Sequence, residues 1–200
     1  MASFVALAGG RVKRIAFLRD LRGRGKGCLK RLLLLRHAKA EPGGPDQDDH
    51  DRALVERGHA DAAAIARYLK AKGYLAAAIL CSTSARTRQT VEPVLAQTPA
   101  PVKYLELLYH APPGAIIATI QNADDGDDVL LVVGHNPGLE QCATMLAREA
   151  VRPREQHRHD VMEEKFPTAA LAVLDFDIAS WKLVVPCSAR LADFVRPKDI

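Results

Sequence analysis

The sequence predicts an α/β fold, a three-layer α/β/α sandwich with a largely parallel central sheet. Short, continuous apolar segments recur along the chain, and such segments are typical of strands buried on both faces of a sheet. Most are followed by a segment with the apolar spacing of a helix. This alternation of strands and helices is the order expected of a mainly parallel sheet with helices on both faces.

Length and composition indicate one globular domain. The chain has 200 residues, of which 48% are hydrophobic and 26% charged. No apolar stretch approaches the roughly 20 residues that a membrane-spanning helix requires, so we expect no membrane partner. The four cysteines show no CxxC spacing, which argues against a zinc cage or a disulfide framework and suits a reducing cytoplasm.

The net charge of +4 is distributed unevenly. Residues 1–31 contain nine Lys or Arg and one Asp, whereas residues 32–200 contain 19 bases and 23 acids. We therefore expect a basic, flexible N-terminal extension at 1–31 and a single, mildly acidic domain at 32–200. The extension could be an organellar transit peptide, a nucleic-acid-binding arm or an unstructured extension, and the last of these is favoured, so a nucleic-acid partner is not expected.

The first predicted strand is Leu32–Leu35, four leucines that run directly into Arg36 and His37. These two side chains then fall at the carboxyl end of the strand, where open α/β sheets place their ligand sites. A cation beside a neutral imidazole suits binding a phosphoryl group and attacking it through nitrogen. The alternative is that His37 only ends a core strand.

The next predicted elements are an exposed loop at 41–51, a helix at 54–72, a strand at 76–81 and a helix that carries Arg86. The hydroxyl groups of Ser82, Thr83 and Ser84 can cap the start of that helix.

The second half continues the alternation. We expect a weak strand or extended loop at 102–108, a short helix after Pro112, and a buried strand at 129–133 that ends in His135 and Asn136. A helix follows this strand. Residues 148–165 are polar, which predicts a mobile segment, and residues 169–176 and 181–185 are predicted to form a closing hairpin.

Three strand–helix junctions should meet at one edge of the sheet, because parallel strands place their carboxyl ends on the same side. They carry Arg36-His37, Ser82 to Arg86, and His135-Asn136. Arginine forks match phosphate oxygens in two-point contacts, and a helix start adds amide donors. The sequence therefore predicts an anion site.

The motifs at these junctions resemble those of the histidine phosphatase superfamily. The stretch containing Arg36-His37-Ala38 is similar to its Arg-His-Gly/Ala signature, Cys81–Thr90 to its second signature and Val133–Pro137 to its third. The stretches Asp51–Leu54, Arg57-Gly58 and Phe166–Ala170 resemble its SixA-like phosphohistidine phosphatase branch. The resemblance covers roughly residues 31–186 and implies a phosphoglycerate mutase-like fold.

The resemblance implies that His37 is a nucleophile that forms a phosphohistidine intermediate, and that Arg36, Arg86 and His135 hold the phosphoryl oxygens. Fixed arginines can stabilise the charge on a phosphoryl group in transfer, so no metal or other cofactor is expected.

Four further residues are weaker candidates for contact with substrate: Asn136, Ser82, Lys39 and Glu106. Lys39 could steer anions toward the site. Glu106 is the candidate proton donor, or else a solvated loop residue. Among the remaining residues, His110 is placed near the rim of the pocket, and Arg52 is expected to pair with a neighbouring acid.

The expected function is that of a metal-independent phosphatase, acting on a phosphorylated substrate that could be a phosphohistidine-bearing protein. The absence of a clear acid favours phosphohistidine weakly, because an imidazole leaving group needs a weaker acid than an alkoxide does. The alternatives are a phosphosugar or nucleotide phosphomonoesterase of the same fold and a non-catalytic protein that binds phosphate or nucleic acid.

Overall fold

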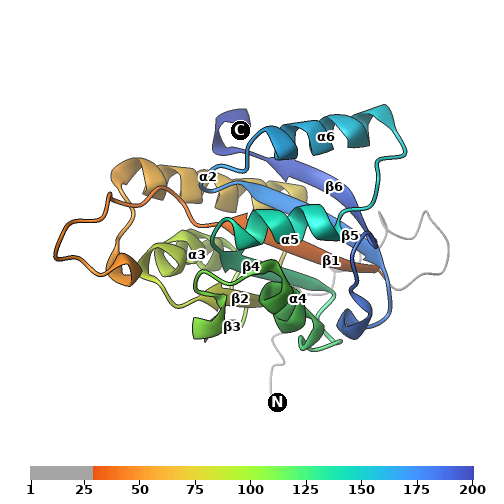
Figure 1. The fold of residues 1–200 in the computed structure, drawn as a ribbon, viewed down its shortest axis with the longest axis horizontal. Helices are drawn as coiled ribbons and strands as arrows, with labels where there is room; N and C mark the ends of the chain where they lie inside the picture. The colour runs from red at the N-terminus through yellow and green to blue at the C-terminus, as the bar shows by residue number, and fades with distance from the viewer. Residues whose placement is uncertain (1–28) are drawn as a thin grey trace, which may run out of the picture.

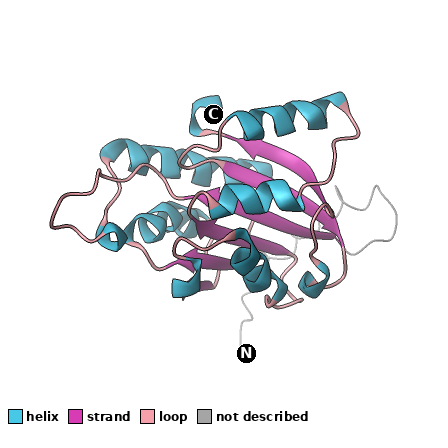
Figure 2. Ribbon diagram, in the orientation of Figure 1, coloured by secondary structure: helices cyan, strands magenta, loops and turns pink. Residues whose placement is uncertain are grey.

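The computed structural model describes residues 29–200, which form one mixed sheet with helices on both faces (Figures 1 and 2). The predicted flexible extension lies, up to residue 28, outside the described residues. The six strands are β1 (Leu29–Arg36), β2 (Ala78–Ser82), β3 (Val102–Leu105), β4 (Val129–Gly134), β5 (Leu171–Asp177) and β6 (Ala189–Val195). The five α-helices are α2 (Glu56–Lys72), α3 (Ala85–Gln97), α4 (Pro113–Gln121), α5 (Gly138–Leu146) and α6 (Pro153–Glu164).

The strand order in the sheet is β3-β2-β4-β1-β5-β6. The pairs β2–β3, β2–β4 and β1–β4 are parallel, whereas β5 runs antiparallel to both β1 and β6. The predicted α/β sandwich with a largely parallel sheet is thus confirmed. Within residues 29–200, none of the helices combines the length and the apolar character needed to cross a membrane.

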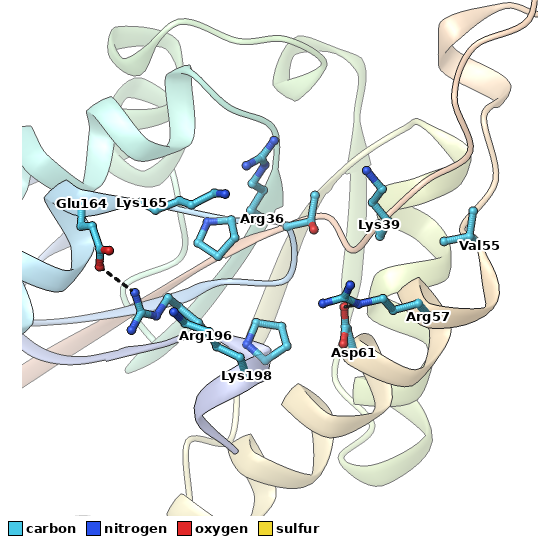
Figure 3. A pocket seen from close by; sticks show the side chains of 12 residues that line it. Arg36, Lys39, Val55, Arg57, Asp61, Glu164, Lys165, Arg196 and Lys198 are labelled. Carbon is cyan, nitrogen blue, oxygen red and sulfur yellow. Dashed lines mark hydrogen bonds and ion pairs between the residues drawn. The ribbon is translucent and has the colours of Figure 1, made fainter.

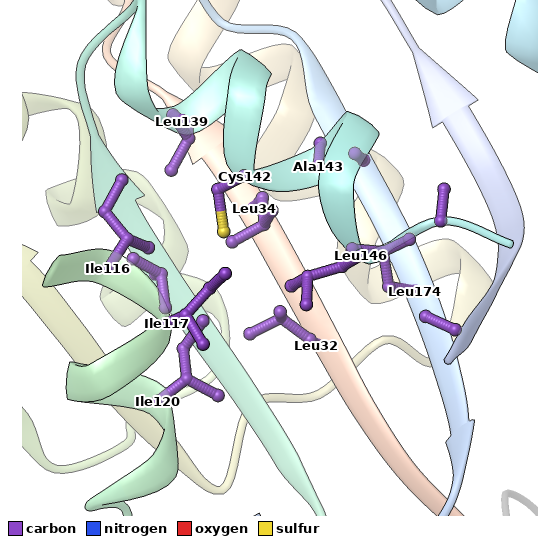
Figure 4. Close-up of a cluster of buried hydrophobic side chains, with 14 of the residues drawn as sticks. Leu32, Leu34, Ile116, Ile117, Ile120, Leu139, Cys142, Ala143, Leu146 and Leu174 are labelled. Carbon is purple, nitrogen blue, oxygen red and sulfur yellow. The ribbon is translucent and has the colours of Figure 1, made fainter. Parts of the chain in front are cut away.

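β1 lies near the centre of the sheet and is buried on both faces. Leu32 and Leu34 pack against α4 and α5 on one side (Figure 4), and Leu33 and Leu35 pack against α2 and α3 on the other. All four leucines are 0% exposed. The unbroken leucine run follows from this position, because side chains alternate between the faces of a strand and both faces here are covered.

β1 begins at Leu29, three residues before the leucine run that marked it in the sequence. Two buried cations at its start have acidic partners on neighbouring segments. Lys30 Nζ lies 3.0 Å from an Asp128 carboxylate oxygen, and Arg31 Nε lies 2.6 Å from Asp175. These ion pairs offset the cost of burying two charged side chains. The strand can therefore begin earlier than its apolar residues alone indicate.

The prediction of a mobile segment at 148–165 is wrong, because most of it forms α6. The helix is strongly polar, and only Glu155 and Met162 are buried in it. The Glu155 carboxylate accepts a hydrogen bond from the backbone N–H of Val151 at 3.1 Å, just before the helix begins. A helix that buries so little apolar surface has almost no periodic signal in the sequence.

The predicted second strand of the closing hairpin is also wrong. Residues Trp181–Leu183 form a 3-10 turn, and the strand that pairs with β5 is β6. The fully buried Trp181 is fixed by its indole N–H, which donates to the Asp127 carbonyl at 2.8 Å. Of the apolar residues at 181–185, Trp181 and Val184 are therefore buried by packing and not by strand pairing, whereas Leu183 and Val185 are exposed.

Candidate active site

His37 follows the last residue of β1, at the carboxyl end of the sheet. Its Nδ1 lies 2.8 Å from the Ala38 carbonyl oxygen. Because a carbonyl only accepts hydrogen bonds, Nδ1 carries the proton in the neutral ring and Nε2 keeps a free electron pair. The backbone is held on both sides, since His37 N–H donates to the Gly134 carbonyl and the Ala169 N–H donates to the His37 carbonyl, each at 3.0 Å.

The His37 imidazole is neutral well below neutral pH. Burial is the largest effect on its pKa, which is lowered to about 4. The Ala38 hydrogen bond opposes this, and the charges of Arg86 and Arg36 also lower the pKa. A neutral ring is the form that can act as a nucleophile.

His135 stands directly beside His37. The two ring centroids are 5.1 Å apart, with the planes tilted by 51°. Burial, followed by the proximity of His37, lowers the pKa of His135 to about 2. Its Nε2 lies 2.9 Å from the Ser82 hydroxyl oxygen at the end of β2, while its buried Nδ1 has no hydrogen-bond partner among residues 29–200.

Arg36 and Asn136 meet at one backbone carbonyl. Arg36 Nη1 donates to the Phe166 carbonyl at 2.7 Å, and Asn136 Nδ2 donates to the same oxygen at 3.1 Å. Asn136 also donates to Glu140 at 2.7 Å. Arg36 Nε and Asn136 Oδ1 are buried and unpartnered within the described part of the chain, so one donor and one acceptor remain available here.

Arg86 lies in the first turn of α3 and is 2% exposed. Its Nη2 lies 2.8 Å from the Asp49 carboxylate, and its Nη1 donates to the Asp49 carbonyl oxygen. Ser84 occupies the position before the helix, but its hydroxyl bonds the Thr87 hydroxyl at 2.9 Å and not a backbone N–H, so the expected side-chain cap at Ser84 is absent.

Asp49 is an acid that the sequence did not single out. Its carboxylate accepts hydrogen bonds from Arg52 at 2.6 Å, Arg86 at 2.8 Å, the Tyr109 hydroxyl at 2.7 Å and His110 at 3.1 Å. The Tyr109 hydrogen bond, followed by that of Arg52, holds the pKa of Asp49 well below its usual range. Asp49 therefore acts as an ionised acceptor and not as a proton donor.

Tyr109 and His110 contact both the Asp49 carboxylate and the ring of His135. The His110 ring stacks on His135 with centroids 5.0 Å apart, and the Tyr109 ring meets His135 edge-on at 5.4 Å. His110 is also one of the non-glycine residues with a positive φ, 49°. Such backbone strain is sparse in proteins and clusters at functional sites.

Lys39 and Glu106 lie outside this cluster. Lys39 is exposed beside the neighbouring groove described below. Glu106 has a 72% exposed side chain, receives a hydrogen bond from the Thr83 hydroxyl, and lies 3.8 Å from His50 Nε2. Both residues are thus at the periphery, whereas the structure brings Arg36, His37, Ser82, Arg86, His135 and Asn136 to one edge of the sheet.

Nothing in the sequence separates Asp49 from its neighbours. The same loop contains Asp46, Asp48 and Asp51, and all four stand in a Pro- and Gly-rich stretch. Only the Asp–x–x–Arg spacing to Arg52 offers a signal, and it is shared by many surface ion pairs. The expected pairing of Arg52 with a neighbouring acid is confirmed, at 2.6 Å from Asp49.

The chain is similar to a known protein family and to known proteins. The model of the histidine phosphatase superfamily (branch 1) matches residues 32–111. An uncharacterised protein of Mycobacterium tuberculosis (strain H37Rv) is 40% identical over 167 residues, which cover 82% of this chain and all of that protein.

Solved structures show the same likeness. SixA of Agrobacterium tumefaciens is 33% identical, with a TM-score of 0.69, over 84% of this chain and 98% of its own. SixA of Nakamurella multipartitia is 28% identical, with a TM-score of 0.74, over 84% and 96%. The protein histidine phosphatase SixA complexed with tungstate, at 21% identity and a TM-score of 0.66, shares the fold.

Proposed function

The chain belongs to the histidine phosphatase superfamily, and on that premise we propose that it is a metal-independent phosphatase that removes the phosphoryl group from phosphohistidine in proteins. Superfamily membership and the SixA likeness support the broader activity, hydrolysis of a phosphorylated substrate. The proposal goes further in two respects: the reaction passes through a covalent phosphohistidine intermediate, and the substrate is phosphohistidine in a protein.

One observation supports the proposal most strongly. The His37 ring is neutral, its Nδ1 is fixed by the Ala38 carbonyl, and the charges of Arg36 and Arg86 act on it. This geometry presents one nitrogen lone pair within a field that attracts phosphoryl oxygens.

The reaction then has two steps. In the first, His37 Nε2 attacks the phosphorus atom, an N–P bond forms, and the bond to the leaving group breaks with its electron pair going to that group. In the second, water attacks the phosphorus of phospho-His37, inorganic phosphate leaves, and the electron pair of the N–P bond returns to Nε2. In this proposal Arg36, Arg86 and the neutral His135 stabilise the equatorial oxygens in both steps.

The structure offers weak provision for protonating a leaving oxygen. Asp49 is held ionised by Tyr109 and Arg52, and the Glu106 carboxylate is exposed. An imidazole leaving group makes a smaller demand on an acid than an alkoxide does, which favours phosphohistidine over a sugar phosphate.

The decisive experiment replaces the nucleophile. His37→Ala should abolish hydrolysis of an aryl phosphate in the presence of a chelator, whereas His59→Ala, a change on an exposed face of α2, should keep wild-type turnover. Rapid quenching of the reaction with labelled substrate in alkaline denaturant should recover a phosphoryl group on the wild-type chain that is stable in alkali and lost in acid, and none on His37→Ala. Turnover retained by His37→Ala would contradict the proposed route.

A substrate panel tests the narrower claim. We expect kcat/KM for phosphohistidine peptides to exceed that for sugar phosphates and nucleotides. The opposite order would favour the phosphomonoesterase alternative.

A further inference from the structure

A basic groove of about 580 Å³ lies beside the phosphoryl site. It runs between the start of α2, the loop that follows α6 and the last turn of the chain (Figure 3). We call it the basic groove and define it by the six bases that line it: Arg36, Lys39, Arg57, Lys165, Arg196 and Lys198. His37, Arg86 and His135 do not line it.

The concentration of positive charge here departs from the rest of the domain. Residues 32–200 contain 19 bases and 23 acids, yet six of these bases and only two acids, Asp61 and Glu164, line the groove. A mildly acidic body with one strongly basic concave face attracts acidic partners to that face.

The basic groove is continuous with the phosphoryl site through Arg36. This arginine precedes His37 in the chain, and its Nη1 donates to the Phe166 carbonyl. Lys165 is the residue before Phe166, and in Figure 3 its side chain extends toward Arg36. A ligand whose phosphoryl group binds beside His37 would therefore have its neighbouring atoms close to the groove.

The cations in the groove differ in availability. Arg196 is engaged by Glu164 at 3.1 Å and by Asp199 at 2.9 Å. The side chains of Lys39, Lys165 and Lys198 are exposed, and their ammonium groups form no hydrogen bond or ion pair with any residue in the described range 29–200. Three ammonium groups from three separate segments are thus directed to solvent along one groove.

Resting on the proposed function, we propose that the basic groove binds an acidic polypeptide segment that flanks the phosphorylated residue of the protein substrate. A second phosphate group would require several donors converging on one point, ideally an arginine fork. Apart from Arg36 of the phosphoryl site, the described cations of the groove that lack an acidic partner are lysines spread over three segments, since the exposed Arg57 guanidinium lies 3.8 Å from Asp61. The lining also includes the apolar side chains of Val55, Pro167 and Pro197. Lysine charges that are spaced along a partly apolar surface suit a peptide whose Asp or Glu side chains are spaced in the same way, with apolar residues between them.

The test measures binding without requiring turnover. A fluorescent peptide that alternates Glu with Gly and Leu, and carries no phosphate, is titrated against wild type, Lys165→Glu/Lys198→Glu and Lys103→Glu/Lys182→Glu. The last variant has the same change in net charge but alters exposed lysines on β3 and in the 181–183 turn, outside the groove. We expect the groove variant to bind about tenfold more weakly and the control to bind like wild type, with the difference shrinking as salt is added.

Kinetics separate this inference from the proposed function. Wild type should hydrolyse a phosphohistidine peptide flanked by Glu with higher kcat/KM than one flanked by Gln, and the groove variant should lose this preference while keeping its aryl phosphate activity. Equal peptide affinity of the groove and control variants would overturn the inference, as would tripolyphosphate binding that depends on Lys165 and Lys198 while the peptide does not bind. Failure to hydrolyse either phosphopeptide, with groove-dependent binding intact, would instead reject the phosphohistidine substrate.

Discussion

At the scale of single residues, the site is a cluster of cations and neutral imidazoles stabilised by one carboxylate. The Asp49 carboxylate accepts hydrogen bonds from two arginines, a tyrosine and a histidine. Asp49 holds Arg86 through both its side chain and its backbone carbonyl. A buried guanidinium without such a partner would be costly to keep in place. Asp49 therefore orients Arg86 while reducing the net positive charge that a phosphate meets.

This role predicts the effect of Asp49→Asn. Loss of the carboxylate should loosen the Arg86 fork, because Nη2 loses its charged partner while Nη1 keeps the Asp49 backbone carbonyl. Misplacement of such a group lowers turnover on the order of tenfold to a hundredfold. Inhibition by inorganic phosphate should not weaken, because the variant removes a negative charge from the site. Steady-state kinetics with an aryl phosphate measure both quantities.

The matched control is Asp46→Asn, which removes the same charge from the same loop without touching Arg86. Equal kcat values for the two variants would show that charge alone, and not the contact, is responsible.

The contrast between Arg36-His37 and Asp49 shows what sequence can indicate at this scale. The pair could be located because it follows an unbroken apolar strand, a position where side chains have a defined direction. Asp49 lies in an irregular loop among three similar aspartates, and its direction depends on contacts with α3 and with the 106–110 segment. Local sequence contains no information about such a long-range contact.

At the scale of elements, α2 and the segment after β1 approach each other very closely. A Cβ atom on Gly58 would lie 2.1 Å from the Lys39 carbonyl oxygen, which belongs to the backbone two residues after His37. The Lys39 carbonyl also accepts from the Val55 N–H at 3.0 Å, and the Ala38 N–H donates to the Thr90 hydroxyl at 2.9 Å on α3. Two helices thus hold the segment that positions His37.

We therefore expect Gly58→Ala to destabilise the fold and to lower activity. The added methyl group must displace backbone, and overpacking of this kind costs about 1–3 kcal/mol of unfolding free energy. Urea unfolding and aryl phosphate turnover are the measurements. Gly114→Ala on α4 is the control, because a Cβ there meets nothing within 4 Å and should stabilise the helix by ~0.5 kcal/mol. An unfolding free energy for Gly58→Ala at or above that of wild type would refute the close-contact argument.

The two wrong predictions of elements, a mobile segment at 148–165 and a strand at 181–185, have a common cause. Sequence periodicity finds an element through the apolar surface it buries, and it finds β1, β4 and α2 for that reason. α6 buries few side chains, and Trp181 is buried without belonging to a strand. In both cases contacts with the rest of the fold determine the local structure.

At the scale of the whole molecule, the buried pair His37 and His135 opposes folding in acid. Burial lowers the pKa of His37 to about 4 and that of His135 to about 2, whereas an unfolded chain protonates its imidazoles near pH 6.5. Between these limits the unfolded state binds more protons than the folded state. Stability is therefore undiminished above pH 6.5 and falls as the pH drops from about 6.5 toward 4.

His37→Asn should make this loss shallower. Each such histidine contributes a slope of up to about 1.4 kcal/mol per pH unit, so removing one should reduce the pH dependence of the unfolding free energy by about that amount between pH 6 and 5. Urea unfolding in phosphate-free buffer at pH 7, 6 and 5 gives the slopes, because a bound anion would stabilise the folded state by itself. His59→Asn removes an exposed imidazole from α2 and serves as the control. A slope for His37→Asn as steep as that of wild type would mean that His37 already accepts a proton in the folded protein near pH 6, and the ring would then be unavailable as a nucleophile in mild acid.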